Sequence, residues 1–94
     1  MDARQLVAWN LRKIRVERGL AQEALAADAS VDRAYVGRVE RALENPTIGV
    51  LERLAAALDI QIIDFFVQPK PGTPEPQVLQ KGRPPSQGRK SVRR

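Results

Sequence analysis

The chain has 94 residues, of which 43% are hydrophobic, and a formal net charge of +5 at pH 7. That length allows one small domain and leaves little room for a closed catalytic site, so we do not expect an enzyme. The sequence has no Cys and no His, which excludes disulfides, the usual Cys/His zinc sites and His-based acid–base catalysis. We therefore expect no metal and no cofactor.

Charge and apolar bulk divide the chain into two parts. Residues 1–68 hold nine Lys/Arg against ten Asp/Glu, a balance of −1, whereas residues 69–94 hold seven Lys/Arg against one Glu, a balance of +6. We predict a folded domain over residues 1–68 and a disordered, basic, Pro/Gly-rich tail over residues 69–94, because the tail has too few apolar residues to offset its ordering entropy. No apolar run approaches the roughly 18 residues of a membrane span, and the N-terminus has no signal-peptide pattern. We expect a soluble protein of the cytoplasm, at the nucleoid, without membrane contact.

The first predicted element is a helix over residues 3–18. Leu6 or Val7, Leu11 and Ile14 recur at helical spacing and form one apolar stripe. Gly19 suits the left-handed position that ends a helix. Trp9 lies off the stripe, and we expect it at the edge of the core, partly buried.

Residues 22–41 predict two short helices joined by a tight turn. Leu25 and Ala29 are four residues apart, and Val36 and Val39 are three apart, so each pair lies on one side of a helix. Asp32 is placed to cap the second of the two helices. Helices this short are not stable alone and must be held by flanking segments, which is the logic of a helix-turn-helix unit.

The remaining apolar residues predict one more regular helix and a short fifth one. Asn-Pro at 45–46 argues against helix in the connection, and Thr47 caps a helix that Asp59 ends. We interpret residues 60–67 as a short fifth helix with Ile63 and Phe66 directed inward. Exposed apolar side chains indicate association surfaces. The residues that this leaves partly exposed, and which we expect in a homodimer contact, are Ile62, Phe65 and Val67.

Several motifs together resemble the Xre/phage-repressor-like (lambda-repressor-like) helix-turn-helix family over about residues 5–67. They are Leu11-Arg12-x-Ile14-Arg15, Gly19-Leu20-x-Gln22-x-x-Leu25-Ala26, Val31-x-x-x-Tyr35-Val36-x-x-Val39-Glu40, Asn45-Pro46-Thr47 and Leu51-x-x-Leu54-Ala55-x-x-Leu58. The resemblance implies an all-α, compact five-helix fold. It also implies a bacterial or phage transcription regulator that binds a double-stranded DNA operator as a homodimer.

The resemblance also implies which residues meet DNA. The third helix would lie in the major groove, and Arg is the side chain best suited to read guanine O6 and N7. The base-reading positions are Arg33, Ala34, Gly37 and Arg38, with Arg33 and Arg38 leading. The backbone-contacting candidates are Gln22, Asp32, Tyr35, Arg41, Asn45 and Thr47.

Arg15 and Glu40 match a pair that forms a salt bridge between the first and third helices in related repressors. We expect this pair to orient the reading helix, because a partly buried ion pair often adds little net stability. Three positions depart from the family pattern: Ala21 stands where Ser or Thr is usual, and Ser30 and Ala42 replace glycines. If Ser30 and Ala42 are left-handed, each carries roughly 1 kcal/mol of backbone strain.

Lys81, Gly82, Arg83 and Pro84 resemble the core of an AT-hook, a minor-groove element, although the upstream arginine is missing. A tail that attracts phosphate nonspecifically is the simpler interpretation. Two alternatives to a DNA-binding regulator stay open: an antitoxin whose tail folds on a toxin, and an antirepressor that uses the same fold to bind only protein.

Overall fold

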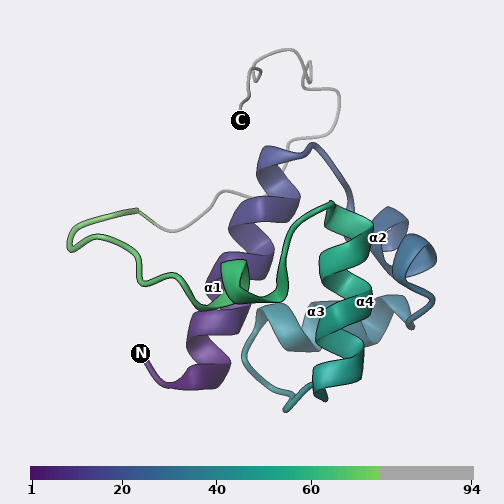
Figure 1. Cartoon of the computed structure of the whole chain (residues 1–94), viewed down its shortest axis with the longest axis horizontal. Coiled ribbons are helices and arrows are strands. Elements are labelled where there is room, and N and C mark those ends of the chain that lie inside the picture. Colours follow the sequence, from purple (N-terminus) through teal and green to yellow (C-terminus); the bar gives the residue numbers. More distant parts are fainter. Residues whose placement is uncertain (75–94) are drawn as a thin grey trace.

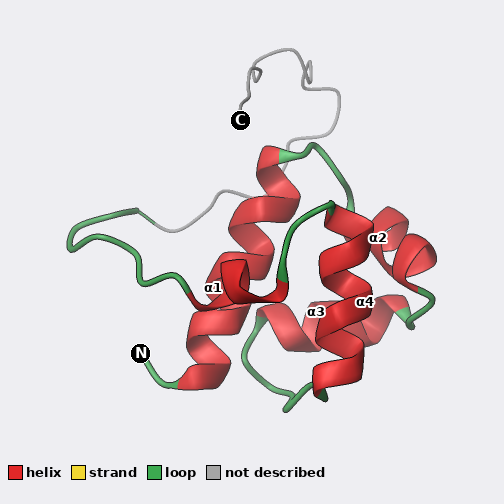
Figure 2. Ribbon diagram, viewed as in Figure 1, coloured by secondary structure: helices red, strands yellow, loops and turns green. Residues whose placement is uncertain are grey.

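The computed structural model describes residues 1–74 and consists of α-helices and one 3-10 segment (Figure 1). The elements are α1 (Ala3–Glu17), α2 (Gln22–Ala29), α3 (Arg33–Glu40), α4 (Ile48–Leu58) and η1 (Ile62–Phe66). No strand occurs in residues 1–74, so the expected all-helical class is confirmed (Figure 2). The expectation of five helices is corrected, because the fifth element is a 3-10 segment of 5 residues. None of the helices in this part of the chain has the length and apolarity needed to cross a membrane.

Side-chain caps begin three of the four α-helices. Asp2 and Gln5 form a reciprocal capping box at α1, Asp32 accepts a hydrogen bond from the backbone N–H of Ala34 at α3, and Thr47 accepts from the backbone N–H of Val50 at α4. Ala21 provides no side-chain cap to α2. The first N–H groups of α2 are therefore open to another acceptor.

All four α-helices end in the same way, on a residue with left-handed backbone. The φ angles of Gly19, Ser30, Ala42 and Asp59 are 72°, 59°, 60° and 58°. At each end, the N–H of the left-handed residue and the N–H of the next residue donate back into the last turn, the paired bonds of a Schellman motif. Only one of the four residues is glycine, so three ends carry a side chain in a strained conformation.

The core lies where these helices meet. Its fully buried side chains come from every element: Leu11, Leu25, Val36, Val39, Leu54, Leu58 and Phe65. Helix α1 packs against α3 and η1, whereas α2 packs against α3 and α4. Trp9 is half-buried, as expected, and Ile14 is packed at the core's edge. Helix α3 thus packs between α1 and α2, and α2 in turn packs against α4.

The orientation expected for residues 60–67 is wrong, because the side chains expected inward are exposed and Phe65, expected at the surface, is buried. Phe65 is fully buried, whereas Ile63 and Phe66 are 66% and 41% exposed. A 3-10 segment has three residues per turn, so Ile62 and Phe65 share one face, and both pack inward. The Nδ2 atom of Asn10 lies 2.9 Å from the carbonyl oxygens of both Phe65 and Val67, which fastens this face to α1.

Candidate nucleic-acid interface

The surface of α3 presents basic and small side chains at its start and near its end. Arg33 and Ala34, the first two residues of α3, are exposed, and Arg38 is half-exposed. Ala34 and Arg38 are four residues apart and lie on one side of the helix, whereas Arg33, next to Ala34 in sequence, projects about 100° away around the helix axis. The predicted base-reading residues Ala34 and Arg38 therefore lie on one side of α3, and Arg33 lies beside them at the start of the helix.

Gly37 does not belong to this exposed face. It is buried, and a Cβ atom at this position would meet Arg41 Nη1 at 3.3 Å and Gln22 Oε1 at 3.7 Å. The long side chains of Gln22 and Arg41 cover the gap that the missing side chain leaves. The expected outward position of Gly37 is thus corrected, and Gly37 instead leaves room for the side chains of Gln22 and Arg41.

A buried ion pair joins α3 to α1. Arg15 Nε donates to Glu40 Oε2 at 2.6 Å and Arg15 Nη2 donates to Glu40 Oε1 at 3.0 Å, with each side chain only 4% exposed. Arg15 Nη1 also donates to the carbonyl of Leu20. Gln22 Nε2 donates to Glu40 Oε1 at 3.0 Å and extends the network to α2. The implied salt bridge is present, and it joins three helices.

An open cleft of about 470 Å³ lies beside this network. Its rim includes the guanidinium-bearing residues Arg12, Arg33 and Arg41, and its wall includes Ala21 and the start of α2. Within residues 1–74, none of these three arginines takes part in an ion pair. The cleft is also lined by the carboxylates of Glu40, which is paired with Arg15, and of Glu23 in the first turn of α2. Arginines outnumber carboxylates in the lining, and with the free N–H groups at the start of α2 they favour an anion such as phosphate.

Arg12 was not among the residues predicted from sequence. It lies three residues before Arg15, so the two project from the same side of α1. That spacing could have indicated it, once Arg15 was expected to face α3. Of the other predicted backbone contacts, Gln22 and Arg41 line the cleft, whereas Asp32, Asn45 and Thr47 are exposed but do not line it.

A second polar cluster lies at the far end of α3. Arg38 Nε donates to Glu44 Oε2 at 2.6 Å, and the Arg38 guanidinium carbon lies 5.8 Å from the centre of the Tyr35 ring. Burial raises the pKa of the Tyr35 phenol above its ordinary value of 10.0, and the Glu44 carboxylate raises it further, while Arg38 and Arg53 oppose the shift. Neither Glu44 nor its contact with Arg38 was predicted from sequence.

Comparison with known proteins identifies the family of this fold. A helix-turn-helix family profile matches residues 11–65. The chain belongs to this helix-turn-helix family. A hypothetical transcription factor of Neisseria meningitidis is 38% identical over 69 residues, which cover 73% of this chain and 65% of that protein. The uncharacterized HTH-type transcriptional regulator y4dJ of Sinorhizobium fredii is 38% identical over 79% of this chain and 95% of its own length.

One similar protein of known structure has been crystallised in complex with DNA. It is the restriction-modification controller protein C.Esp1396I, whose structure was solved as a tetramer with its natural 35 base-pair operator. One chain of that structure superposes on the present chain with a TM-score of 0.65. It is 35% identical, and the match covers 70% of this chain and 87% of that protein. The predicted AT-hook-like residues Lys81, Gly82, Arg83 and Pro84 lie outside the residues that our structure describes.

Proposed function

We propose that this helix-turn-helix chain is a sequence-specific transcriptional regulator, acting as a repressor, that binds a palindromic DNA operator as a homodimer. The observation that carries the proposal is the exposure of Arg33 and Ala34 and the partial exposure of Arg38 on α3, which the buried Arg15–Glu40 pair joins to α1. The major groove is about 12 Å wide and accepts one α-helix. Two copies of α3 would enter successive major grooves about 34 Å apart.

Backbone contacts would come from the arginine-lined cleft. Arg12 and Arg41 can neutralise a phosphate beside α3, while the uncapped start of α2 offers N–H donors to the same oxygen atoms. Such contacts fix the register of the protein on the duplex without reading sequence. Base reading then falls to Arg33 and Arg38, each of which can bond guanine O6 and N7.

Selection of bound duplexes from a random DNA pool tests this proposal. We expect the wild-type chain to enrich a palindrome, and we expect Arg33→Ala/Arg38→Ala to lose it. Arg4→Ala serves as the matched control, because Arg4 is exposed on the first turn of α1 and does not line the cleft. Failure of the wild-type chain to enrich any sequence would contradict the proposal and favour a protein partner, such as a toxin or an antirepressor target.

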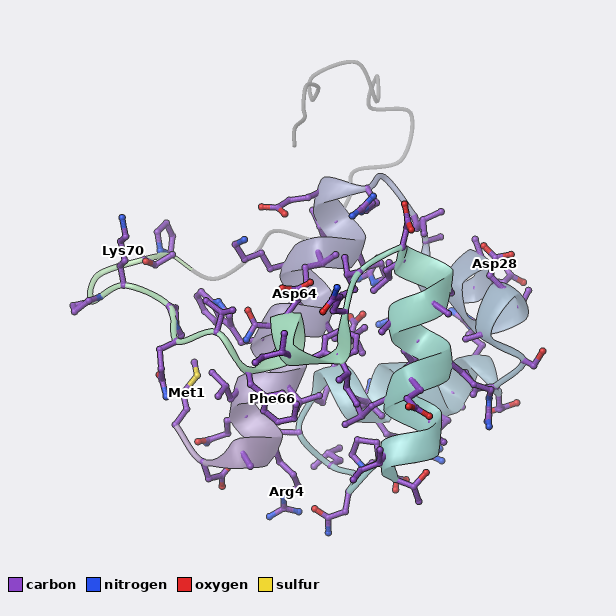
Figure 3. The ribbon with its side chains drawn as sticks, viewed as in Figure 1. Met1, Arg4, Asp28, Asp64, Phe66 and Lys70 are labelled. Carbon is purple, nitrogen blue, oxygen red and sulfur yellow. The ribbon has the colours of Figure 1, made fainter. Side chains whose placement is uncertain are left out.

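The homodimer would form through the apolar side chains that η1 leaves exposed. Ile63, Phe66 and Val67 are 66%, 41% and 56% exposed, and Met1 is 58% exposed. Figure 3 shows Met1 and Phe66 toward the same side of the view, away from Asp28 of α2. Ile62 and Phe65 drop out of the expected contact because they pack on the core, whereas Val67 remains in it.

A charged residue placed among these exposed apolar side chains tests the proposed dimer contact. We expect Phe66→Asp to raise the dimer dissociation constant at least tenfold in sedimentation experiments, because it places a charge in an apolar interface. Ala27→Asp, at an exposed position of α2, is the control and should leave association unchanged. A Phe66→Asp chain that dimerises like wild type would exclude this surface.

A further inference from the structure

Arg38 is held on two sides before any DNA is bound. Its Nε atom donates to Glu44 Oε2 at 2.6 Å, and its guanidinium lies over the Tyr35 ring at 5.8 Å. The Arg38 side chain is 42% exposed and the Glu44 side chain 29% exposed. The contact is therefore accessible from solvent, while both partners are partly enclosed.

The end of α3 brings Glu44 to this place. Ala42 is left-handed, and the N–H of Leu43 donates to the carbonyl of Arg38 at 2.9 Å. This Schellman motif reverses the chain, so that the residue after Leu43 returns alongside the last turn of α3. Glu44 thus meets a side chain six residues earlier in the sequence, at a spacing that no continuous helix would provide.

We infer that Glu44 is a positioning residue that sets Arg38 for reading a guanine, an inference that rests on the proposed DNA-binding function. A guanidinium presents its five N–H groups in a rigid fork. When Nε is occupied by Glu44, the two terminal nitrogens remain to bond guanine O6 and N7 together. Because Tyr35 and Glu44 restrict the rotamers of Arg38, less side-chain freedom is lost when the base is bound.

The negative charge of Glu44 has a second expected effect, on binding to DNA of any sequence. This effect distinguishes a residue that positions Arg38 from one that only attracts DNA. A negative charge near the reading face repels DNA phosphates and weakens binding to every sequence. Glu44 therefore raises discrimination at one base pair and lowers nonspecific affinity. A residue that only stabilised the fold would raise or lower both together.

Quantitative binding to a library of operator variants tests the inference, with the full chain and four variants: Arg38→Ala, Glu44→Ala, Glu44→Gln and Glu52→Ala. The position at which Arg38→Ala loses its guanine preference marks the base that Arg38 reads. We expect Glu44→Ala to lose at least tenfold in preference at that same position, with other positions changed less than twofold. Glu44→Gln should lose less, because its amide oxygen can still accept from Nε. Glu52→Ala, a change at an exposed carboxylate that, unlike Glu44, has no ion pair in residues 1–74, should match wild type.

Binding to an unrelated duplex and an NMR measurement complete the test. Glu44→Ala should bind unrelated DNA as tightly as wild type or more tightly. The Arg38 Nε–H resonance should move toward its solvent-exposed position in Glu44→Ala, while the amide spectrum of the core stays unchanged.

Three results would overturn the inference, and they differ from failure of the proposed function. An unchanged guanine preference in Glu44→Ala would remove the positioning role while leaving the regulator proposal intact. Tighter operator binding by Glu44→Ala with full preference retained would mean that Glu44 competes with DNA for Arg38. A uniform loss at all positions would indicate a structural role. No enrichment by the wild-type chain would instead defeat the proposed function, and the inference with it.

Discussion

Tyr35 shows how a single side chain can report on the reading end of α3. Its phenol is partly buried beside Arg38 and Glu44, and burial is the first cause of its raised pKa, followed by the charge of Glu44. The neutral phenol is favoured in the folded chain relative to the unfolded chain. The stability that this provides is present below the ordinary pKa of 10.0 and is lost as the pH rises through the raised value.

We predict opposite shifts of the Tyr35 pKa in two variants. Glu44→Gln removes a negative charge and should lower the pKa toward its ordinary value, whereas Arg38→Ala removes a positive charge and should raise it. Phenolate absorbance measures the titration directly, because Tyr35 is the chain's one tyrosine. If the Tyr35 pKa shifted in the same direction in both variants, the charges of Glu44 and Arg38 would not have the opposite effects on the phenol that we expect.

The left-handed residues Ser30 and Ala42 each carry strain that a glycine would not. A left-handed backbone costs an L-residue about 1–2 kcal/mol, and a glycine at the same position avoids this strain. Part of the stability gained in this way is lost again, because glycine has greater conformational freedom in the unfolded chain. We predict that Ala42→Gly stabilises the domain by about 0.5–1 kcal/mol in urea unfolding. Ala27→Gly, at an exposed right-handed position of α2, is the control and should destabilise by about 1 kcal/mol. Equal effects of the two substitutions would contradict this account.

At the scale of the elements, the Arg15–Glu40 pair decides how α3 is held. Each partner is buried and bonded twice to the other, and Glu40 also accepts from Gln22. Removing one partner leaves a buried charge unpaired, which costs about 3–5 kcal/mol, whereas replacing both with apolar residues can be neutral. We therefore expect the pair to contribute more to the position of α3 than to net stability.

We predict that Glu40→Ala lowers the free energy of unfolding by about 3 kcal/mol and that Arg15→Met/Glu40→Met recovers most of the loss. The double variant should nevertheless bind operator DNA more weakly than wild type, because α3 loses its anchor to α1. Urea unfolding and operator binding measure the two effects separately. A double variant that is less stable than Glu40→Ala would show that the pair contributes net stability.

At the scale of the whole molecule, the excess positive charge and the proposed reading residues lie in different parts of the sequence. Residues 1–68 have a balance of −1, whereas residues 69–94 have a balance of +6. Arg12, Arg33 and Arg41 concentrate positive charge locally around the cleft, against this neutral background. Long-range attraction to DNA would then depend on the tail, while sequence preference would depend on α3.

Truncation after Val67 tests whether attraction to DNA depends on the tail and sequence preference on α3. We predict weaker DNA binding and a shallower dependence of the binding constant on salt, because fewer counterions are released when fewer cationic side chains meet phosphate. The preferred operator sequence should not change. The control replaces residues 69–94 with a neutral Gly/Ser segment of equal length, which should behave like the truncation. An unchanged salt dependence would exclude a role of the tail in DNA attraction.

The sequence by itself determined the helices and their ends. The spacing of apolar residues indicated which segments are helical, and Asp32 and Thr47 indicated where two of the helices begin. Both features are local, because capping and helical periodicity involve residues that are near one another in the sequence. It also indicated the Arg15–Glu40 pair and most of the α3 face through family resemblance. Only the tertiary structure decided the phase of η1, where the buried residue is Phe65 and not Phe66. A five-residue segment fits two helical phases equally well, and the hydrogen bonds of Asn10 select between them.

The remaining features of the site also required tertiary structure. Arg12 joins Arg33 and Arg41 around one cleft only when α1 packs against α3, and Glu44 meets Arg38 only when the chain reverses at Ala42. Gly37 is covered by side chains from α2 and from the end of α3, which its place in the sequence does not show. Local spacing specifies helices because their hydrogen bonds join near neighbours, whereas these contacts join side chains that the packing of the core brings together.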